Sequence, residues 1–243
     1  MAVYDRMLTQ ELKKTAFRNH VDLIGVTDLS VFDDIPIKER PVRILSDAKA
    51  VIVYAVKFES VAELSRESWY SQMEKLLIRV DKKLREFLTE KGYKAYSFTT
   101  EIDFHLWTDE LHKRPFSERS LARQPRWCGI YRRLQDAAVS AGLGRVGKNR
   151  LLITPQYGPS VHLSMIITDA PLEPDSPCEE DPCAGCNLCL KACPTGALTV
   201  LTRRGRPDES KCKPWNCHLA CLRVCHEKFL EQPQQLDEQQ KPA

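Results

Sequence analysis

The sequence predicts a mixed α/β domain followed by a smaller cysteine-rich domain, and three observations support this prediction. Short runs rich in β-branched residues alternate with stretches of helical periodicity over most of the chain. Nine of the ten cysteines lie beyond residue 172. Four prolines mark a connecting segment between the two regions: Pro171, Pro174, Pro177 and Pro182. We therefore expect an α/β domain over 1–172, a second domain over 173–230 and a flexible tail over 231–243.

Length, composition and charge limit the classes of protein that this chain can represent. With 243 residues, 42% of them hydrophobic and 28% charged, it matches soluble globular proteins rather than disordered or fibrous ones. A formal net charge of +3 is too small to indicate binding to nucleic acid or membranes. The first residues contain neither an apolar run nor a twin-arginine signal, so we expect a cytoplasmic protein. In that reducing compartment, cysteines are expected to bind metal or react rather than form disulfides.

The first half of the chain reads as alternating helices and strands. The pattern predicts a helix over 8–18 and a strand over 22–27 (DLIGVT). The run AVIVYAV at 50–56 is rich in β-branched residues and short, which favours a buried strand. Apolar residues recur at helical spacing over 69–88, and Gly92 ends that helix. A further strand is expected over 93–99.

The stretch 101–130 shows no clear periodicity, which indicates either a functional loop or a wrong assignment. A helix is expected next over 131–141, followed by strands over 151–154 and 161–168. Arginines and one lysine are numerous in and after the loop, and they would form either a phosphate-binding cradle or a solvated basic surface. These residues are Arg114, Arg119, Arg123, Arg126, Arg132, Arg133, Arg145, Lys148 and Arg150.

A glycine motif at 142–147 matches the dinucleotide-binding fingerprint but stands in the wrong context. Gly142, Gly144 and Gly147 in AGLGRVG fit GxGxxG. That fingerprint must follow a strand and open a helix, because the helix N-terminus holds the pyrophosphate. Here the glycines close a predicted helix and lead into the apolar run 151–153. We therefore interpret them as a helix C-cap that leads into a tight turn.

The first group of cysteines has the spacing of bacterial ferredoxins. It spells CxxCxxCxxxCP and consists of Cys183, Cys186, Cys189 and Cys193, with Pro194 after the last. Three closely spaced thiolates can bind three irons of one cubane, while the fourth serves a neighbouring cluster. Zinc is usually held by two separated CxxC pairs, which leaves a third cysteine at this spacing unexplained. We therefore favour iron–sulfur over zinc or free thiols.

A second group supplies the four further ligands that this crossover pattern requires: Cys212, Cys217, Cys221 and Cys225. By the same pattern, Cys225 completes the cluster of Cys183, Cys186 and Cys189, whereas Cys193 joins Cys212, Cys217 and Cys221. We thus predict a ferredoxin-like domain with two 4Fe-4S clusters. The spacing of the second group is irregular, so a single cluster with spare thiols is the alternative, and its last three cysteines could lie along one helix face.

Several reactive side chains fall outside this ligand set. Cys178 is most simply a free thiol in the proline-rich segment. His218 and His226 lie among the cysteines and could bind iron as in Rieske centres. Because enough cysteines are present, we prefer surface roles for the two histidines or roles that support the ligands.

The chain resembles the epoxyqueuosine reductases and their relatives, the reductive dehalogenases. The resemblance rests on AAVSAGLGRVGKNRLLI, ITDAPLEPD and CAGCNLCLKACPTGAL, and on DLIGVTD and AKAVIVYAV nearer the start. It implies a corrinoid-binding domain related to the nitroreductase fold, whose cobalt receives electrons from the clusters. It also implies that Gly144 and Lys148 contact the corrinoid.

The sequence departs from that family in two places. The family continues beyond its clusters with a helical-repeat segment associated with tRNA, which is missing after Cys225, so tRNA is a doubtful partner. The family also places an acidic proton donor where a gapless comparison puts Cys128. Cys128 is therefore a candidate proton donor, with a buried inert thiol as the alternative. Other candidate donors in the loop are Asp103, Asp109, Glu110 and Glu118.

Two functional hypotheses follow. The first is a cytoplasmic oxidoreductase whose clusters reduce a bound cobalamin, which in turn reduces a small or nucleoside-like substrate. Its electron donor would be a ferredoxin or flavodoxin. The second is a ferredoxin-like electron carrier, or a corrinoid-reducing partner protein, without substrate chemistry of its own. A zinc-stapled binding module is disfavoured by the cysteine spacing.

Overall fold

The computed structural model describes residues 4–35, 40–58, 68–97, 133–198, 211–212, 217 and 219–231. Helix α1 (Arg6–Arg18) begins the chain and is followed by β1 (Leu23–Thr27), the 3-10 helices η1 (Leu29–Phe32) and η3 (Pro41–Arg43), and β2 (Ala50–Lys57). Next come α2 (Ser68–Glu90), β3 (Ala95–Ser97), α6 (Leu134–Ser140), β4 (Arg145–Val146), β5 (Leu152–Ile153) and β6 (Val161–Thr168). Helices α7 (Leu188–Ala192) and α8 (Ala220–Glu231) carry the cysteine-rich segment.

The main sheet has four strands in the order β1-β2-β6-β3, and every neighbouring pair is antiparallel. Gly25 of β1 faces Val53 of β2, and Val53 in turn faces Met165 of β6. Strands β4 and β5 form a separate two-stranded ribbon. Helices and strands are therefore mixed along the chain as predicted, but the described strands do not form the parallel βαβ units of a doubly wound α/β sheet.

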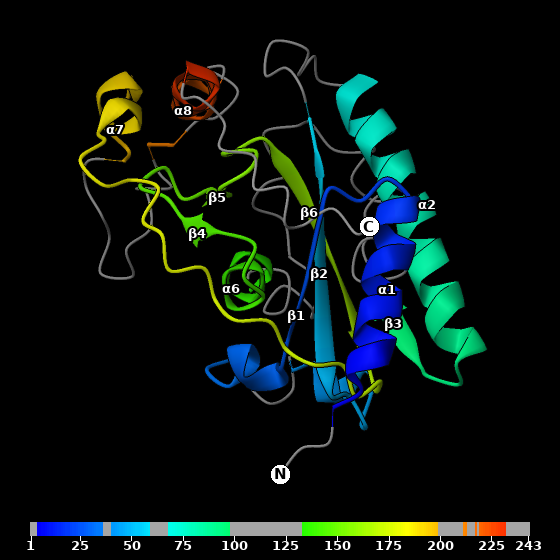
Figure 1. The fold of residues 1–243 in the computed structure, drawn as a ribbon. Helices are drawn as coiled ribbons and strands as arrows, with labels where there is room; N and C mark the ends of the chain where they lie inside the picture. Colours follow the sequence, from blue (N-terminus) through cyan, green and yellow to red (C-terminus); the bar gives the residue numbers. More distant parts are fainter. Residues whose placement is uncertain are drawn as a thin grey trace, which may run out of the picture.

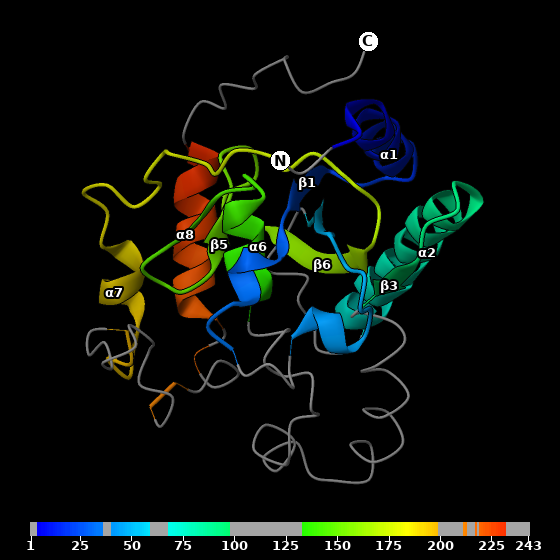
Figure 2. The same cartoon turned by 90° about the horizontal axis from the view of Figure 1, so that it is seen from below.

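Helices cover both faces of this sheet (Figures 1 and 2). On one face, α1 and α2 pack against alternate residues of β2, which are Ile52, Tyr54 and Val56. On the other face, α6 and η1 pack against Val51, Val53 and Ala55. Both faces of β2 are thus covered, and every residue from Ala50 to Val56 is buried. This explains why the strand is a continuous hydrophobic run without polar alternation. The sequence AVIVYAV thus marks the centre of the molecule.

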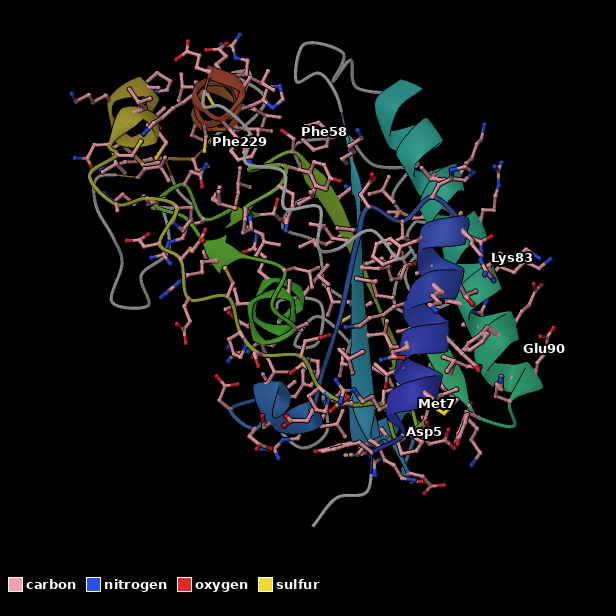
Figure 3. All side chains as sticks on the ribbon, in the orientation of Figure 1. Asp5, Met7, Phe58, Lys83, Glu90 and Phe229 are labelled. Carbon is pink, nitrogen blue, oxygen red and sulfur yellow. The ribbon has the colours of Figure 1, made fainter. Side chains whose placement is uncertain are left out.

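Polar contacts fix the two helices on the first of these faces. The carboxylate of Asp5 accepts a hydrogen bond from the backbone N–H of Leu8 (2.9 Å) and so caps α1. The buried Asp81 of α2 accepts hydrogen bonds from the Tyr54 hydroxyl (3.3 Å) and the Arg85 Nε (2.9 Å). Lys83 and Glu90 project away from the sheet on the outer side of α2 (Figure 3). Helix α2 is therefore amphipathic, as its spacing predicts.

The proline-rich segment is held against the domain that precedes it. Asp175 accepts a hydrogen bond from the Val26 backbone N–H (2.8 Å) and forms an ion pair with Lys13 (2.5 Å). Leu172 forms a parallel bridge with Asp5. These contacts fix the segment along the edge strand β1, so it is an ordered connection. The division of the chain at residue 172 stays a prediction.

Most predicted elements are found within a few residues of their expected bounds. The strands expected over 22–27, 50–56, 151–154 and 161–168 correspond to β1, β2, β5 and β6, and the helix expected over 69–88 is α2. The stretch 101–130 lies outside the described residues, as does the tail beyond residue 231. None of the helices in the described ranges is long and apolar enough to cross a bilayer.

His162 in β6 should make the stability of the chain depend on pH. Burial disfavours its charged form and lowers its pKa from the ordinary value of 6.5. Below about pH 6.5 this histidine binds a proton more readily in the unfolded chain than in the folded one. Its contribution to the free energy of unfolding is therefore full above that pH and falls as the pH drops. A single histidine contributes at most about 1.4 kcal/mol per pH unit. We expect urea unfolding midpoints to fall less between about pH 8 and pH 5 in His162→Gln than in the unsubstituted chain. Equal slopes would contradict this.

Candidate metal centre

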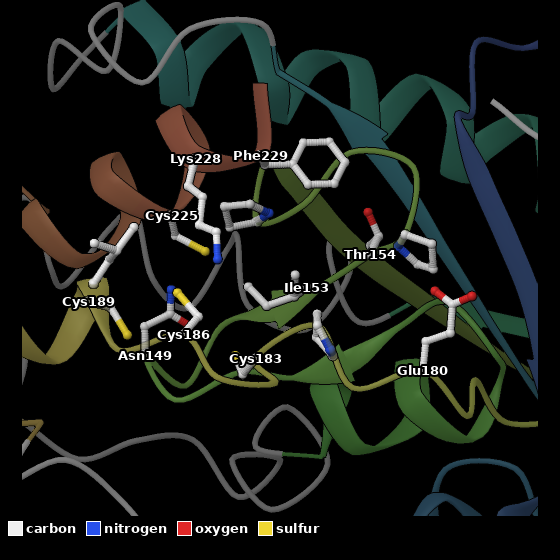
Figure 4. Close-up of a pocket in the computed structure, with 14 residues that line it drawn as sticks. Asn149, Ile153, Thr154, Glu180, Cys183, Cys186, Cys189, Cys225, Lys228 and Phe229 are labelled. Atoms are coloured by element: carbon white, nitrogen blue, oxygen red, sulfur yellow. The ribbon is translucent and has the colours of Figure 1, made fainter. Parts of the chain in front are cut away.

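Cysteines from two distant parts of the sequence line one pocket. Cys183 and Cys186 lie in the loop before α7, Cys189 lies on α7 and Cys225 lies on α8. Helices α7 and α8 pack against each other, which brings the four thiols to a common pocket of about 170 Å³ (Figure 4). This is the set of four that the crossover pattern assigns to one cluster.

The turn between β4 and β5 forms the floor of this pocket on the side of the sheet. The backbone N–H of Lys148 points to the Cys183 Sγ (3.4 Å), and the Lys148 Nζ donates to the Cys186 carbonyl (2.7 Å) and to the Asn187 Oδ1 (2.9 Å). Asn149 lines the pocket from the same turn. The segment GKN, in the turn between β4 and β5, thus joins the α/β part of the chain directly to the first cysteine group.

The second cysteine group lies next to the first. Cys212 and Cys217 are close enough to Cys221 for their charges to raise its pKa, and Cys189 adds to this effect. Cys221 and Cys225 both lie on α8, one turn apart. Cys217 precedes the helix, and Leu219, which lies between Cys217 and the start of α8, has a positive φ of 54°. Cys217, Cys221 and Cys225 therefore do not share one helix face.

Cys193 follows α7, and its Sγ lies 3.7 Å from the Thr195 hydroxyl. Burial would raise its pKa, but hydrogen bonds from the backbone of Leu198 and the side chain of Thr195 outweigh this and lower it. These donors favour a thiolate at Cys193, the form that binds metal.

Burial and mutual repulsion oppose ionisation of the two thiols on α8. Desolvation, followed by the charges of Cys183, Cys189 and Cys186, raises the pKa of Cys225 to about 12. Desolvation and the charges of Cys217 and Cys212 raise the pKa of Cys221 to about 11. In contrast, the Leu188 backbone N–H and the Lys228 ammonium lower the pKa of Cys186. Partly buried thiolates so close together repel one another, and a cationic group between them would stabilise them.

The donor set fits an iron–sulfur cluster. Within the described ranges, no three His, Cys, Asp or Glu side chains meet closely enough to hold a single metal ion. A four-iron cubane is bound by one thiolate per iron, so its ligands surround the cluster and do not meet at one point. Four thiols around a pocket, three from the run with ferredoxin spacing and one from α8, match that requirement.

Helix α8 is held in place by contacts other than the cysteines. His226 is buried, and its Nδ1 is hydrogen-bonded to the Ser160 hydroxyl. The Phe229 ring lies against Gly158, where a Cβ atom would come within 2.6 Å of it. Leu222 forms a small apolar cluster with Phe58, which follows β2. His226 therefore supports Cys225 by fixing its helix, in line with the supporting role that we preferred for it.

Replacing His226 should destabilise the docking of α8 without removing a ligand. We expect His226→Leu to lower the free energy of unfolding by about 1–3 kcal/mol, because the buried Ser160 hydroxyl loses its partner. Ser160→Ala should have a smaller effect, and the double variant should show coupling of at least about 0.5 kcal/mol. Anaerobic urea unfolding measures the stability, and iron analysis serves as the control. Loss of iron from fully folded His226→Leu would instead identify His226 as a ligand.

The other predicted site residues are placed as follows. Gly144 packs against β5, because a Cβ atom there would lie 2.3 Å from the Ile153 carbonyl oxygen. Lys148 is engaged by the cysteine-rich segment. Cys178 lies in the ordered connection, apart from the pocket lining. The candidate proton donor Cys128 and the side chain of His218 lie outside the described residues, as do the loop acids.

Among the pocket residues that sequence reasoning missed are Asn149 and Lys228. The one available signal for Asn149 was its place between the glycine turn and the apolar run LLI. Lys228 carried no signal, because a lysine three residues after a cysteine is usual on a helix surface.

The mixed helix and sheet layer, joined through one turn to a pocket lined with cysteines, places this chain in the class of cysteine-rich α/β proteins that includes iron–sulfur reductases. No family model matches the sequence. An epoxyqueuosine reductase of Bacillus cereus is 33% identical over 192 residues, which cover 74% of this chain and 43% of the relative. Over 67 residues, an epoxyqueuosine reductase of Listeria monocytogenes is 57% identical, covering 27% of this chain and 17% of the relative.

Solved structures show the same fold. An epoxyqueuosine reductase crystallised with an epoxyqueuosine-modified tRNA stem loop superimposes with a TM-score of 0.60 at 22% identity, covering 90% of this chain and 64% of that one. The chain is therefore epoxyqueuosine reductase-like: it is similar in sequence to these enzymes over most of its length, and it shares the fold of a catabolic reductive dehalogenase, with a TM-score of 0.57 at 17% identity. It spans about half the length of the curated relatives that it matches along most of its sequence.

Proposed function

We propose that this chain is an iron–sulfur oxidoreductase that passes electrons through two 4Fe-4S clusters to a bound cobalamin, which reduces a small or nucleoside-like substrate. The observation that carries the proposal is the shared pocket of Cys225 with Cys183, Cys186 and Cys189. A lone ferredoxin-type run needs a distant fourth cysteine, and the fold supplies one at that place. When bound, the cobalamin supplies the reducing chemistry.

The chain's own residues would hold the two clusters in sequence. Cys183, Cys186, Cys189 and Cys225 would bind the first cluster, beside the turn that leads into the mixed helix and sheet layer. Cys193, Cys212, Cys217 and Cys221 would bind the second, in a ferredoxin-like domain. Since the first cysteine group adjoins the turn between β4 and β5, we propose that its cluster delivers electrons to the corrinoid-binding α/β domain. A cytoplasmic ferredoxin or flavodoxin would supply them.

The proposed corrinoid domain, of nitroreductase-related type, rests on the relatives. Gly144 and Lys148 were the expected contacts, but both meet protein atoms in this structure. Lys148 therefore supports the first cysteine group, whereas Gly144 packs against β5, and contact of either residue with a corrinoid stays a prediction. A nucleoside-like substrate is proposed because a protein of the same fold was crystallised with an epoxyqueuosine-modified tRNA stem loop. Cys128 stays the proposed proton donor.

An anaerobic preparation tests the proposal. We expect about eight irons per chain and a broad visible absorption that dithionite bleaches, since each cubane holds four irons. Adding cob(II)alamin should give bound cobalt after gel filtration and a changed cobalt EPR spectrum. Iron without affinity for cobalamin would contradict the reductase and favour the electron carrier. Stoichiometric zinc without iron would contradict both.

A further inference from the structure

Asn149 is a buried amide that the described part of the protein satisfies on one side alone. Its side chain is 6% exposed. The Oδ1 accepts a hydrogen bond from the Leu151 backbone N–H (3.2 Å). The Nδ2 is fully buried, and it makes no hydrogen bond within the described part of the chain. A buried donor without a hydrogen bond costs about 1–3 kcal/mol, so this atom indicates a partner that belongs in the pocket.

The orientation of the amide follows from its surroundings. A backbone N–H can only be met by an acceptor, so the oxygen must face Leu151 and the nitrogen must face the opposite side. Arg150, between the two residues, has a positive φ of 66°, and the Arg150 N–H donates to the Gly147 carbonyl (2.9 Å). The turn is therefore closed on itself, and Asn149 is held in one position.

The nitrogen side of Asn149 belongs to the cysteine pocket. Asn149 lines that pocket together with Cys183, Cys186, Cys189 and Cys225 (Figure 4). The turn that carries Asn149 and the helix α8 that carries Cys225 both border this pocket. Sulfur atoms held in the pocket are thus the acceptors that this donor can meet. A thiolate or sulfide of an iron–sulfur cluster accepts such hydrogen bonds, which are among the features that set its reduction potential.

We propose that the Asn149 Nδ2 donates a hydrogen bond to a sulfur of the first cluster, on the side of Cys225, and thereby raises the reduction potential of that cluster. The inference rests on the proposed function, because it requires a cluster on these four cysteines. On reduction the cluster gains one electron from an external reductant, and no proton moves. The hydrogen bond strengthens as the sulfur becomes more negative, so it stabilises the reduced form more than the oxidised form. Asn149 thus acts on the reduction potential of the cluster and takes no part in binding the iron.

Two substitutions separate the donor from the turn that it helps to form. Asn149→Asp keeps an oxygen for the Leu151 N–H and replaces the donor by a negative charge. Asn149→Leu removes both groups without adding charge. We expect the ratio of reduced to oxidised first cluster, at a fixed solution potential, to fall about tenfold in Asn149→Leu, equivalent to about 59 mV for one electron. The fall should be larger in Asn149→Asp. Redox titration of the full chain, followed by EPR, measures these ratios.

Gln156→Leu is the matched control, because Gln156 is an amide in the following loop that does not line the pocket. Its potential should stay unchanged. Unchanged potentials in both Asn149 variants, at full iron content, would overturn the inference and leave the proposed clusters intact. If the unsubstituted chain holds no four-iron cluster, the inference and the proposed function are both overturned.

A second measurement avoids variants that assemble poorly. The unsubstituted chain is labelled with ¹⁵N in its asparagine side-chain amides, reduced, and studied by pulsed EPR. We expect a nitrogen coupling to the first cluster that persists in Asn187→Ser, where the asparagine that follows Cys186 is removed. Absence of the coupling, or its loss in Asn187→Ser, would overturn the inference.

Discussion

Replacing Cys225 with alanine is expected to remove the first cluster and to lower the iron content from about eight toward about four atoms per chain. Cys225 is the one cysteine of the pocket lining that comes from α8, and the other three cysteines cannot complete a four-thiolate set without it. The EPR signal of the reduced first cluster should disappear. Anaerobic iron analysis and EPR of the reduced protein measure both effects.

Cys178→Ala is the matched control for this experiment. Cys178 is also a free cysteine of the C-terminal part, but it lies outside the pocket lining, so its loss should leave about eight irons. Cys221→Ala should remove the second cluster and leave the signal of the first. Retention of all the iron in Cys225→Ala would contradict the crossover pairing. Equal losses in Cys225→Ala and Cys178→Ala would indicate general instability instead of ligand loss.

Local patterns explain why the strands and helices were predictable but their arrangement was not. The run AVIVYAV and the spacing of apolar residues over α2 depend only on near neighbours, and both predictions were confirmed. The pairing of β6 with both β2 and β3 joins segments far apart in sequence. Strand order and antiparallel direction depend on those distant contacts, which periodicity does not contain.

The candidate site divides in the same way. The run from Cys183 to Cys193 is a local motif that can be read from the sequence. Its crossover pattern requires one cysteine from a distant part of the chain. In the structure, Cys225 lines the same pocket as the first three cysteines of the run. The alternative that Cys217 lies on one helix face with Cys221 and Cys225 was wrong. Leu219 has a positive φ, which is not helical, and α8 begins only at Ala220. The role of Asn149 required the fold, since only burial shows that one half of its amide lacks a partner.

Gly25→Ala is expected to destabilise the fold strongly, because the added methyl group meets backbone atoms. A Cβ atom at Gly25 would lie 2.1 Å from the Ala141 carbonyl oxygen and 2.6 Å from the Leu143 Cδ1. Gly25 is in the edge strand β1, and Ala141 ends α6, so the added methyl group must separate a strand from a helix. Because the nearest atom is backbone, no rotamer change relieves the contact. We expect a loss of about 3 kcal/mol, at the upper end for overpacked cores.

Gly92→Ala separates this steric effect from the general cost of replacing a glycine. Gly92 has a φ of +86° but no atom within 4 Å of an added Cβ, so its substitution should cost only the backbone strain, about 1–2 kcal/mol. For a domain of this size, 1 kcal/mol corresponds to about 2–4 °C in Tm. Thermal unfolding under anaerobic conditions should therefore show a shift of roughly 6–12 °C for Gly25→Ala and roughly 2–8 °C for Gly92→Ala. Because the chain continues from Ala141 into the turn that holds Lys148 and Asn149, Gly25→Ala should also release iron at a lower temperature. If Gly92→Ala proves the more damaging change, the close packing of β1 against the end of α6 does not control the stability of the fold.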